Sequence, residues 1–270
     1  MDISEFSTPQ LKEMQACLLN ILLTIDKVCR EHNLRYYIIA GTLLGAVRHK
    51  GFIPWDDDAD VAMPREDYEK LIRHAREWLP ERYELVSGTD NPRYPYLFAR
   101  IQDRETTYVL RRRFDFVGGV PVDVFPLDGM TPSGLRRRVH YFKYGVAKKL
   151  LYHSLVDPYK HGKGLRCLFA KMMHKLVSPA WAHHTADRLQ QEFSIGKTGL
   201  VADHDNKPSR GILPAEVYGE PRPIEFCGHM LMGVSNPDAY LRYCYGDYMA
   251  MPSKLPPQNF RALDLHKSYK

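Results

Sequence analysis

Apolar residues recur at helical spacing near the start of the chain, from about Pro9 to His32. Thr8 is suited to cap that helix and Pro9 to occupy its first turn. Further along, short alternating or continuous apolar runs predict strands, and a period near 3.6 predicts helices. We therefore expect strands at about 35–40, 58–63, 82–86, 96–102, 106–110 and 120–125, and helices at about 43–47 and 65–79.

The second half of the chain has a different pattern. Residues 131–193 predict helices, with breaks near 158–164 and at Pro179. Turn and cap residues add a hairpin over 225–234 that turns at Gly228, and a short helix from Asn236-Pro237 to about Gly246. A strand-rich half followed by a helical stretch predicts an α+β (mixed α/β) fold.

The composition narrows the class of protein. With 270 residues, 44% hydrophobic and 26% charged, the chain is typical of a soluble globular protein. Its five cysteines show no metal-ligand spacing, which predicts reduced thiols in a cytoplasmic protein without structural zinc. Met1 to Glu5 lack the basic start of a signal peptide, and no apolar run reaches the roughly 18 residues of a membrane span. We expect neither that route of secretion nor an integral membrane protein.

The positive charge is concentrated in one segment. The net charge is +6, yet residues 131–175 hold eleven Lys or Arg against one acid, Asp157, so the remainder sums to −4. Such a segment predicts a localised anionic partner. An anionic membrane surface or lipid-linked acceptor, an anionic polymer, and a merely solvated face all remain open. Because no nucleic-acid reader motif is recognisable, no nucleic acid is expected.

The pair Asp58 and Asp60 is the first candidate for chemistry. Residues two apart in a strand face the same side, and Ala59, Val61 and Met63 mark the strand as buried. Two like charges so placed repel unless a cation neutralises them. Carboxylate oxygens suit Mg²⁺, or Mn²⁺, so these residues are candidate metal ligands.

Gly41 and Thr42 offer a candidate phosphate site. They follow a predicted strand and precede a predicted helix, where glycine allows close approach and a hydroxyl and helix amides donate to anionic oxygens. Arg48 and Lys50 would add positive charge. The alternative is that this Gly-Thr pair only caps a helix.

Asp123 is the third candidate carboxylate, since it lies within the apolar strand segment Pro121 to Phe125. A buried Asp needs a partner, which a shared metal would supply. Asp123 could instead pair with an arginine, and Asp56 and Asp57 could form a solvated turn. The combination of these motifs favours metal-dependent phosphoryl or nucleotidyl transfer over either alternative.

Three segments resemble a known family. The run from Gly41 to Tyr68 is similar to the signature of the LicD family of phosphocholine transferases, and Val122 to Gly129 and Tyr245 to Met249 resemble its later blocks. The resemblance implies a nucleotidyltransferase-like mixed sheet flanked by helices. Residues 1–130 with 215–270 would form the catalytic core, and 131–214 a basic helical insertion that contacts acceptor or membrane.

The resemblance also implies a reaction. Family members transfer phosphocholine from CDP-choline to a sugar hydroxyl of a surface glycopolymer, of the teichoic acid or lipopolysaccharide type, and fukutin-type relatives transfer ribitol phosphate. Asp58 and Asp60 correspond to the paired acids and Asp123 to the third. The alternatives are transfer of another polyol or amino-alcohol phosphate from its CDP derivative, and a membrane- or glycopolymer-binding protein without catalysis.

A choline group adds one expectation about aromatic residues. Its quaternary ammonium has no hydrogen-bond donor and binds to aromatic faces. Trp55, Tyr245 and Tyr248 are candidates, although ordinary packing is the alternative for each of them. Asp56 is a further candidate for substrate binding. The expected place of work is the cytoplasm, with peripheral contact at the inner face of the plasma membrane. The acceptor sugar and the oligomeric state do not follow from the sequence.

Overall fold

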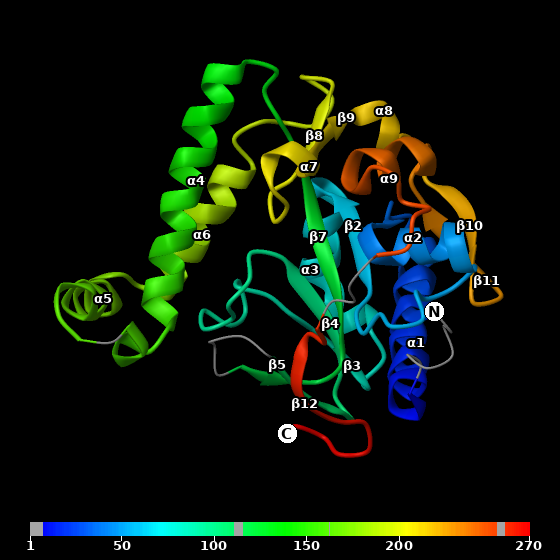
Figure 1. Cartoon of the computed structure of the whole chain (residues 1–270), viewed down its shortest axis with the longest axis horizontal. Coiled ribbons are helices and arrows are strands. Elements are labelled where there is room, and N and C mark those ends of the chain that lie inside the picture. Colours follow the sequence, from blue (N-terminus) through cyan, green and yellow to red (C-terminus); the bar gives the residue numbers. More distant parts are fainter. Residues whose placement is uncertain (1–7, 111–115, 162, 253–256) are drawn as a thin grey trace.

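The architecture comes from a computed structural model that describes residues 8–110, 116–161, 163–252 and 257–270 (Figure 1). Met1 to Glu5, on which the prediction about a signal peptide depends, lie outside the described residues. No helix in the described ranges has the length and apolarity needed to cross a membrane. All five cysteines are free thiols.

Within the described residues, nine strands form one mixed sheet at the centre of the molecule. Its main path runs β10-β11-β1-β2-β7-β4-β3, and β8 and β9 extend it from β7. The strands are β1 (Tyr37–Ile38), β2 (Asp60–Pro64), β3 (Tyr83–Val86), β4 (Ala99–Asp103), β7 (Pro121–Gly129), β8 (Leu200–Asp203), β9 (Ile212–Pro214), β10 (Arg222–Phe226) and β11 (His229–Gly233). A smaller sheet holds β12 (Phe260–Asp264), β5 (Thr107–Leu110) and β6 (Val117–Gly118).

Three N-terminal helices pack against this sheet: α1 (Pro9–Glu31), α2 (Ala40–His49) and α3 (Arg65–Trp78). The Thr8 hydroxyl accepts a hydrogen bond from the Leu11 amide at 3.2 Å and so caps α1. Apolar residues recur at helical spacing along α1 and give the helix one apolar face, which is buried in the core. They include Leu11, Met14, Leu18, Ile21, Leu22, Ile25 and Val28.

The remaining helices are α4 (Gly134–Leu155), the 3₁₀ turn η2 (Pro158–His161), α5 (Leu165–Leu176), α6 (Pro179–Gln190), α7 (Pro208–Gly211), α8 (Ala215–Tyr218) and α9 (Pro237–Tyr245). In Figure 1, α4 and α6 stand beside the sheet on the left, and α5 lies further out. α4 packs against α6 and against α5.

The α+β class is confirmed, since the central sheet is mixed. β2 and β7 are parallel, whereas β1 with β2 and β4 with β7 are antiparallel. The predicted breaks in the helical region and the hairpin at Gly228 are present as well.

One detail of the helical region differs from expectation. Residues 200–214, inside the predicted helical insertion, include β8 and β9, and β8 pairs with β7 of the central sheet. Two strands this short give almost no periodic signal, so the pattern of the sequence could not reveal them. The division into a core and an insertion at 131–214 stays a prediction.

Candidate functional site

Asp60 is the first residue of β2, and Asp58 lies in the loop two residues before it, so the strand begins later than the predicted start near residue 58. The Asp60 amide donates to the Thr42 hydroxyl at 2.8 Å, and the Asp60 carbonyl accepts from the Ile39 amide at 3.1 Å. These bonds join the start of β2, an interior strand of the sheet, to the first turn of α2 and the residue before it. The sequence elements predicted to cooperate, Gly41-Thr42 and the acid pair, therefore do meet, and the Thr42 side chain is committed to positioning β2.

A row of charged residues crosses three neighbouring strands at this point. Asp60 on β2 is in register with Asp123 on β7, and Asp123 is in register with Arg100 on β4. Arg100 Nε donates to Asp123 Oδ1 at 2.6 Å, and Nη2 donates to Oδ2 at 3.1 Å. Such a two-pronged bond fixes both planar groups. The arginine partner considered for Asp123 is thus present, beside the two other acids.

The acids of this site repel one another where water is largely excluded. Burial, followed by the charges of Asp58 and Asp123, raises the pKa of Asp60 well above its ordinary value. Burial and then Asp57 and Asp123 raise the pKa of Asp58 to about 6. Burial and then Asp58 and Asp57 raise the pKa of Asp56 to about 8. The cluster therefore cannot be fully ionised near neutral pH without added positive charge.

The loop before β2 is fixed from two sides. The Gln15 side-chain amide on α1 donates to the Asp56 carbonyl at 2.9 Å. Gly41 faces the Asp56 carboxylate so closely that a Cβ there would lie 2.7 Å from Oδ2. The predicted close approach at Gly41 is present, but here it accommodates a protein carboxylate.

Asn259 closes the site from the far end of the chain. Its backbone amide donates to Asp57 Oδ2 at 2.7 Å. Its side-chain Nδ2 donates to Asp57 Oδ1 at 2.9 Å and to Asp58 Oδ2 at 2.8 Å. Asp57 is only 4% exposed, so it is a buried, bonded carboxylate and not part of a solvated turn.

The two basic candidates on α2 have different surroundings. Arg48 donates to the Tyr248 carbonyl at 3.2 Å. Its positive charge offsets part of the rise in the pKa of Asp56. Lys50 is exposed in the left-handed C-cap of α2, and its carbonyl accepts from the Cys227 amide at 2.6 Å. The fold thus places Lys50 at the other end of α2 from Gly41.

The three aromatic candidates for choline binding also differ in their surroundings. Burial, followed by the charge of Asp60, raises the pKa of the Tyr245 hydroxyl, and Asp56 and Asp58 act in the same direction, whereas the residue as a whole is 43% exposed. The Tyr248 hydroxyl donates to Asp238 at 2.8 Å on α9, and the Tyr248 ring packs on the main core. Trp55 is half-buried against that core.

Several residues of the site were missed by reasoning from sequence. A small cleft opens at the acids, lined by Asp57, Asp58, Tyr96, Arg100, Tyr108, Leu110, Pro121, Asp123 and Asn259. The Arg100 guanidinium lies 4.3 Å from the centre of the Tyr96 ring, a cation–π contact that also orients it. Arg100 could have been predicted from the sequence, because a charged residue inside an apolar strand needs a partner, just as Asp123 does.

The acid cluster has the donor chemistry of a divalent-cation site. In the part of the chain that the structure describes, no three His, Cys, Asp or Glu side chains are already arranged around one metal position. The carboxylates of Asp58 and Asp60 are nevertheless hard oxygen donors, and a cation between them would relieve the repulsion that raises their pKa. The residues present therefore fit Mg²⁺ or Mn²⁺.

Comparison with known proteins indicates the class of protein to which this site belongs. Residues 33–144 match the family model described as LicD/FKTN/FKRP, nucleotidyltransferase domain. The matched range holds the acid pair, Asp123 and Arg100. The chain therefore carries a domain that is similar to the nucleotidyltransferase domain of the LicD family.

Individual relatives extend the similarity beyond that domain. The chain is 28% identical over 261 residues to the lipopolysaccharide cholinephosphotransferase LicD of Haemophilus influenzae, which covers 92% of this chain and 93% of that protein. It is also 38% identical over 68 residues to an uncharacterized protein of Rickettsia prowazekii, covering 25% of this chain and 24% of that protein.

Proposed function

We propose that this protein is a phosphocholine transferase that moves phosphocholine from CDP-choline to a sugar hydroxyl of a glycopolymer precursor and releases CMP. The observation that carries the proposal is the acid row on β2 and β7, which lies inside the LicD-family match. It is supported by similarity over nearly full length to a lipopolysaccharide cholinephosphotransferase. The acceptor class follows from that relative, and teichoic acid is the other glycopolymer to be tested.

The proposal assigns a divalent cation, Mg²⁺ or Mn²⁺, to Asp58 and Asp60, with Asp123 beside them. When bound, such an ion neutralises diphosphate charge and stabilises the attacking and leaving oxygens of an in-line displacement. The high pKa of Asp60 supports this assignment, because a group that resists ionisation when free gains most from a positive neighbour.

Asp123 and Arg100 have a shared role in the proposal. The two-pronged bond holds the Asp123 carboxylate in one orientation, on the same face of the sheet as its register partner Asp60. From there Asp123 orients or deprotonates the acceptor hydroxyl. Arg100 is a positioning residue in this scheme, since it acts through Asp123.

The donor is held from the α2 and α9 sides. Arg48 supplies positive charge near Asp56, and the first turn of α2, at Gly41-Thr42, lies against the start of β2. Tyr245 is the best placed of the three aromatic candidates to meet the choline ammonium, because it combines a π face with nearby carboxylates. Trp55 and Tyr248 are further candidates, whereas Lys50 is the weakest substrate contact.

The proposed place of work is the cytoplasm, at the inner face of the plasma membrane. The basic segment at 131–175 supports peripheral contact with anionic lipid, and a lipid-linked glycan would be presented there.

A donor screen tests the proposal. Purified protein with Mg²⁺ and a glycan acceptor should release CMP from CDP-choline, and CDP-choline should raise the melting temperature. Release from another CDP-alcohol only would replace phosphocholine by that group. No release from any CDP donor, with vesicle or glycan binding retained, would leave a binding protein without catalysis.

A further inference from the structure

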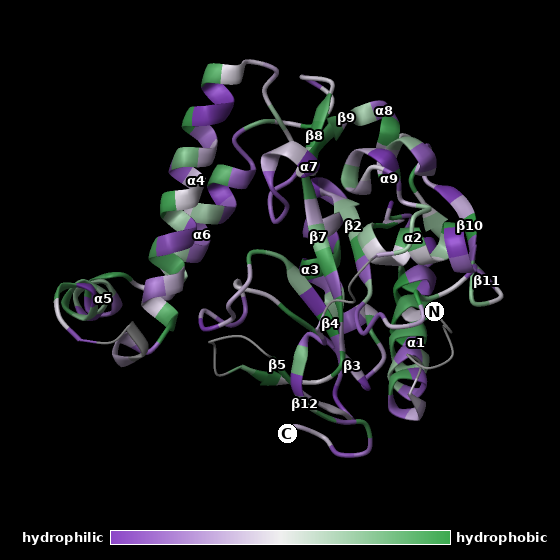
Figure 2. Ribbon diagram, viewed as in Figure 1, coloured by the Kyte–Doolittle hydropathy of each residue, from purple (hydrophilic) through white to green (hydrophobic). Residues whose placement is uncertain are grey.

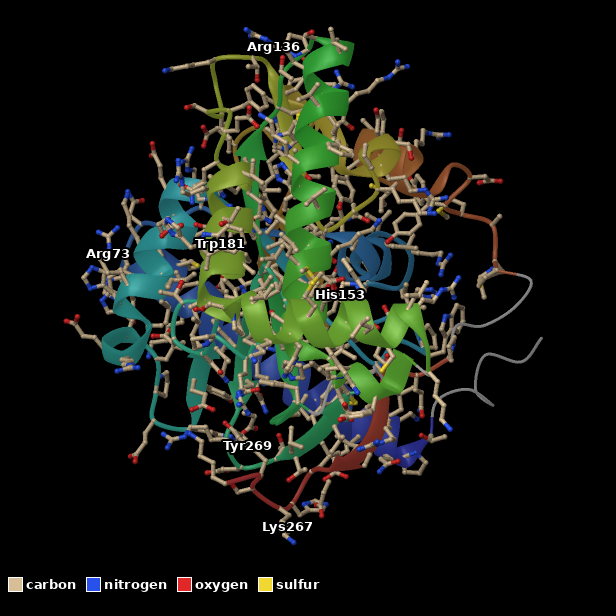
Figure 3. The ribbon with its side chains drawn as sticks, turned by 90° about the vertical axis from the view of Figure 1, so that its left-hand side faces the viewer. Arg73, Arg136, His153, Trp181, Lys267 and Tyr269 are labelled. Carbon is tan, nitrogen blue, oxygen red and sulfur yellow. The ribbon has the colours of Figure 1, made fainter. Side chains whose placement is uncertain are left out.

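The helices α4, α5 and α6 carry an unusual concentration of exposed apolar side chains. Of the eighteen large hydrophobic residues that are exposed among the described ones, eleven lie between Leu135 and Trp181. Figure 3 faces this side of the molecule, with Trp181 on α6 and Arg136 near the start of α4. Exposed apolar side chains gathered on helices that pack against one another are typical of an interaction site.

The helix α5 presents its apolar stripe outward. The buried residues Cys167 and Ala170 face the rest of the fold, where α5 packs on α4 and η2. At 100° per residue, the exposed apolar residues fall within an arc of about 100° on the opposite side. They are Leu165 (85% exposed), Leu168 (64%), Phe169 (49%), Met172 (46%) and Leu176 (69%).

Basic residues flank that stripe on both edges. By the same helical geometry, Arg166 lies on one edge, and Lys171 and Lys175 lie on the other. Long basic side chains beside an apolar arc can cover it with their stems and still reach charged headgroups. Helix α5, about 18 Å long at 1.5 Å per residue, is too short to cross a bilayer and suits its surface plane.

The helix α4 repeats the arrangement over a longer span. One stripe is buried toward α6 and the sheet, whereas a second, at spacings of four, three and four, is exposed: Leu135, Val139, Phe142 and Val146. Arg138 and Lys149 lie on one edge of the exposed stripe and Lys143 and Arg136 on the other. Purple and green residues alternate along α4 in Figure 2, as two apolar stripes separated by charge require.

The two stripes differ from an ordinary solvated face in their charge pairing. Of the basic residues on the stripe edges, Lys143 pairs with Glu192 at 3.7 Å, and Lys171 lies 4.3 Å from the centre of the Tyr159 ring. Within the residues it describes, the structure gives no ion pair to the others: Arg136, Arg138, Lys149, Arg166 and Lys175. Phe142 and Val146 also line an apolar groove of α4 and α6 together with Trp181. Apolar side chains bordered by cations, most of them without an ion pair, are complementary to an anionic lipid surface, since a second copy of this basic face would be repelled.

We propose that the outward faces of α4 and α5 form a membrane-docking surface that inserts its apolar stripes into the headgroup region of an anionic phospholipid bilayer. The proposal is independent of the transferase activity, because none of these residues belongs to the acid site. It goes beyond electrostatic attraction, since it assigns part of the binding to buried apolar area.

Cosedimentation with vesicles separates the two contributions. Full-length protein should pellet with 1:1 phosphatidylglycerol–phosphatidylcholine vesicles. The variant Leu168→Ser, Phe169→Ser, Met172→Ser, which keeps every charge, should lose at least tenfold in partition at low salt. A control variant, Ile195→Ser, Met230→Ser, Tyr243→Ser, removes three exposed apolar side chains elsewhere and should pellet like wild type.

A charge variant completes the test. Arg166→Gln, Lys171→Gln, Lys175→Gln should weaken partition by about fivefold per cation, with an effect that salt suppresses. Circular dichroism checks that each variant is folded. The proposal is overturned if wild type does not pellet or if the apolar variant pellets as well as the control. It is also overturned if sedimentation velocity shows a wild-type dimer that the apolar variant abolishes while neither protein binds vesicles.

Discussion

The acid site and the α4–α5 face depart from the usual distribution of residues in opposite ways. At the acid site, charges are buried and the fold supplies their partners: Arg100 for Asp123 and Asn259 for Asp57 and Asp58. On the α4–α5 face, apolar side chains are exposed, and most of the basic residues beside them, Lys143 excepted, have no ion pair within the described residues. Both arrangements lower the free energy of unfolding. Burial destabilises the charged form of a side chain, and an exposed apolar side chain contributes no hydrophobic stabilisation.

The difference indicates what each region still lacks. The acid cluster has too much negative charge to be ionised by itself, which is why we propose that it binds a small cation and an anionic substrate. The helical face has unmatched apolar area and positive charge, so it calls for an extended anionic apolar surface. Variants of the acid site should therefore change catalysis and leave membrane binding intact, and variants of the α4–α5 face should do the reverse.

The largest expected effect is at the acid pair. Asp58→Asn or Asp60→Asn should lower CMP release by at least about a thousandfold, since each removes a charged metal ligand. Each should leave the fold intact or stabilise it, because the change relieves carboxylate repulsion. Turnover and thermal unfolding would be measured on the same preparations, with Asp90→Asn as the control acid outside the cluster. Unchanged turnover in either site variant would remove the metal assignment.

Asp123 and Arg100 should behave differently from the acid pair in stability. Removing one member of a buried ion pair leaves the other uncompensated, so Asp123→Asn and Arg100→Met should each cost about 3 kcal/mol in the free energy of unfolding. Transfer should fall about a hundredfold while donor affinity, measured by calorimetry, falls less. Equal loss of donor affinity in Asp123→Asn and Asp58→Asn would reduce Asp123 to a metal ligand.

The basic residues of α4 should change location and not chemistry. Arg136→Gln, Arg138→Gln, Lys149→Gln should reduce activity on a lipid-linked acceptor by about tenfold or more in vesicles, since each cation near an anionic leaflet contributes about 1 kcal/mol. Activity on a soluble acceptor analogue should be unchanged. A parallel loss on both acceptors would contradict the separation of the two regions.

The smallest expected effect is a pH dependence of stability in the metal-free protein. The folded pKa of Asp56, about 8, lies above its ordinary value of 3.8, so the folded state holds a proton that the unfolded state has released. This group therefore lowers stability progressively as pH rises from about 4 to about 8. With a chelator present, the melting temperature of wild type relative to Asp56→Asn should fall by a few degrees over that range. Mg²⁺ should reduce the fall, and a flat difference would contradict the raised pKa.

The sequence predicted the acids and, as one alternative, an arginine partner for Asp123, but not the hydrogen-bond donor to Asp57 and Asp58. Asp60 and Asp123 stand out because each is a charged residue in an apolar strand, and Asp58 because it lies two residues before Asp60. Asn259 could not be found in this way, because its position over Asp57 depends on β12 pairing with β5 across about 150 residues. No local pattern encodes such a contact.

The helical region shows a second limit. The stripe of α5 has the spacing of any helix that packs on a core, so periodicity predicts the helix correctly and gives no sign that its apolar side faces outward. Only the packing of Cys167 and Ala170 against the fold decides the orientation. The excess of basic residues was visible in the sequence, but not the exposed apolar area beside them.

The most direct test of the central claim is the mass of the acceptor after reaction. Wild-type protein with CDP-choline, Mg²⁺ and a lipopolysaccharide-type glycan should add one phosphocholine to the acceptor and release an equal amount of CMP, while Asp60→Asn should do neither. An acceptor of unchanged mass with wild type, or full modification by Asp60→Asn, would contradict a phosphocholine transferase built on this acid site.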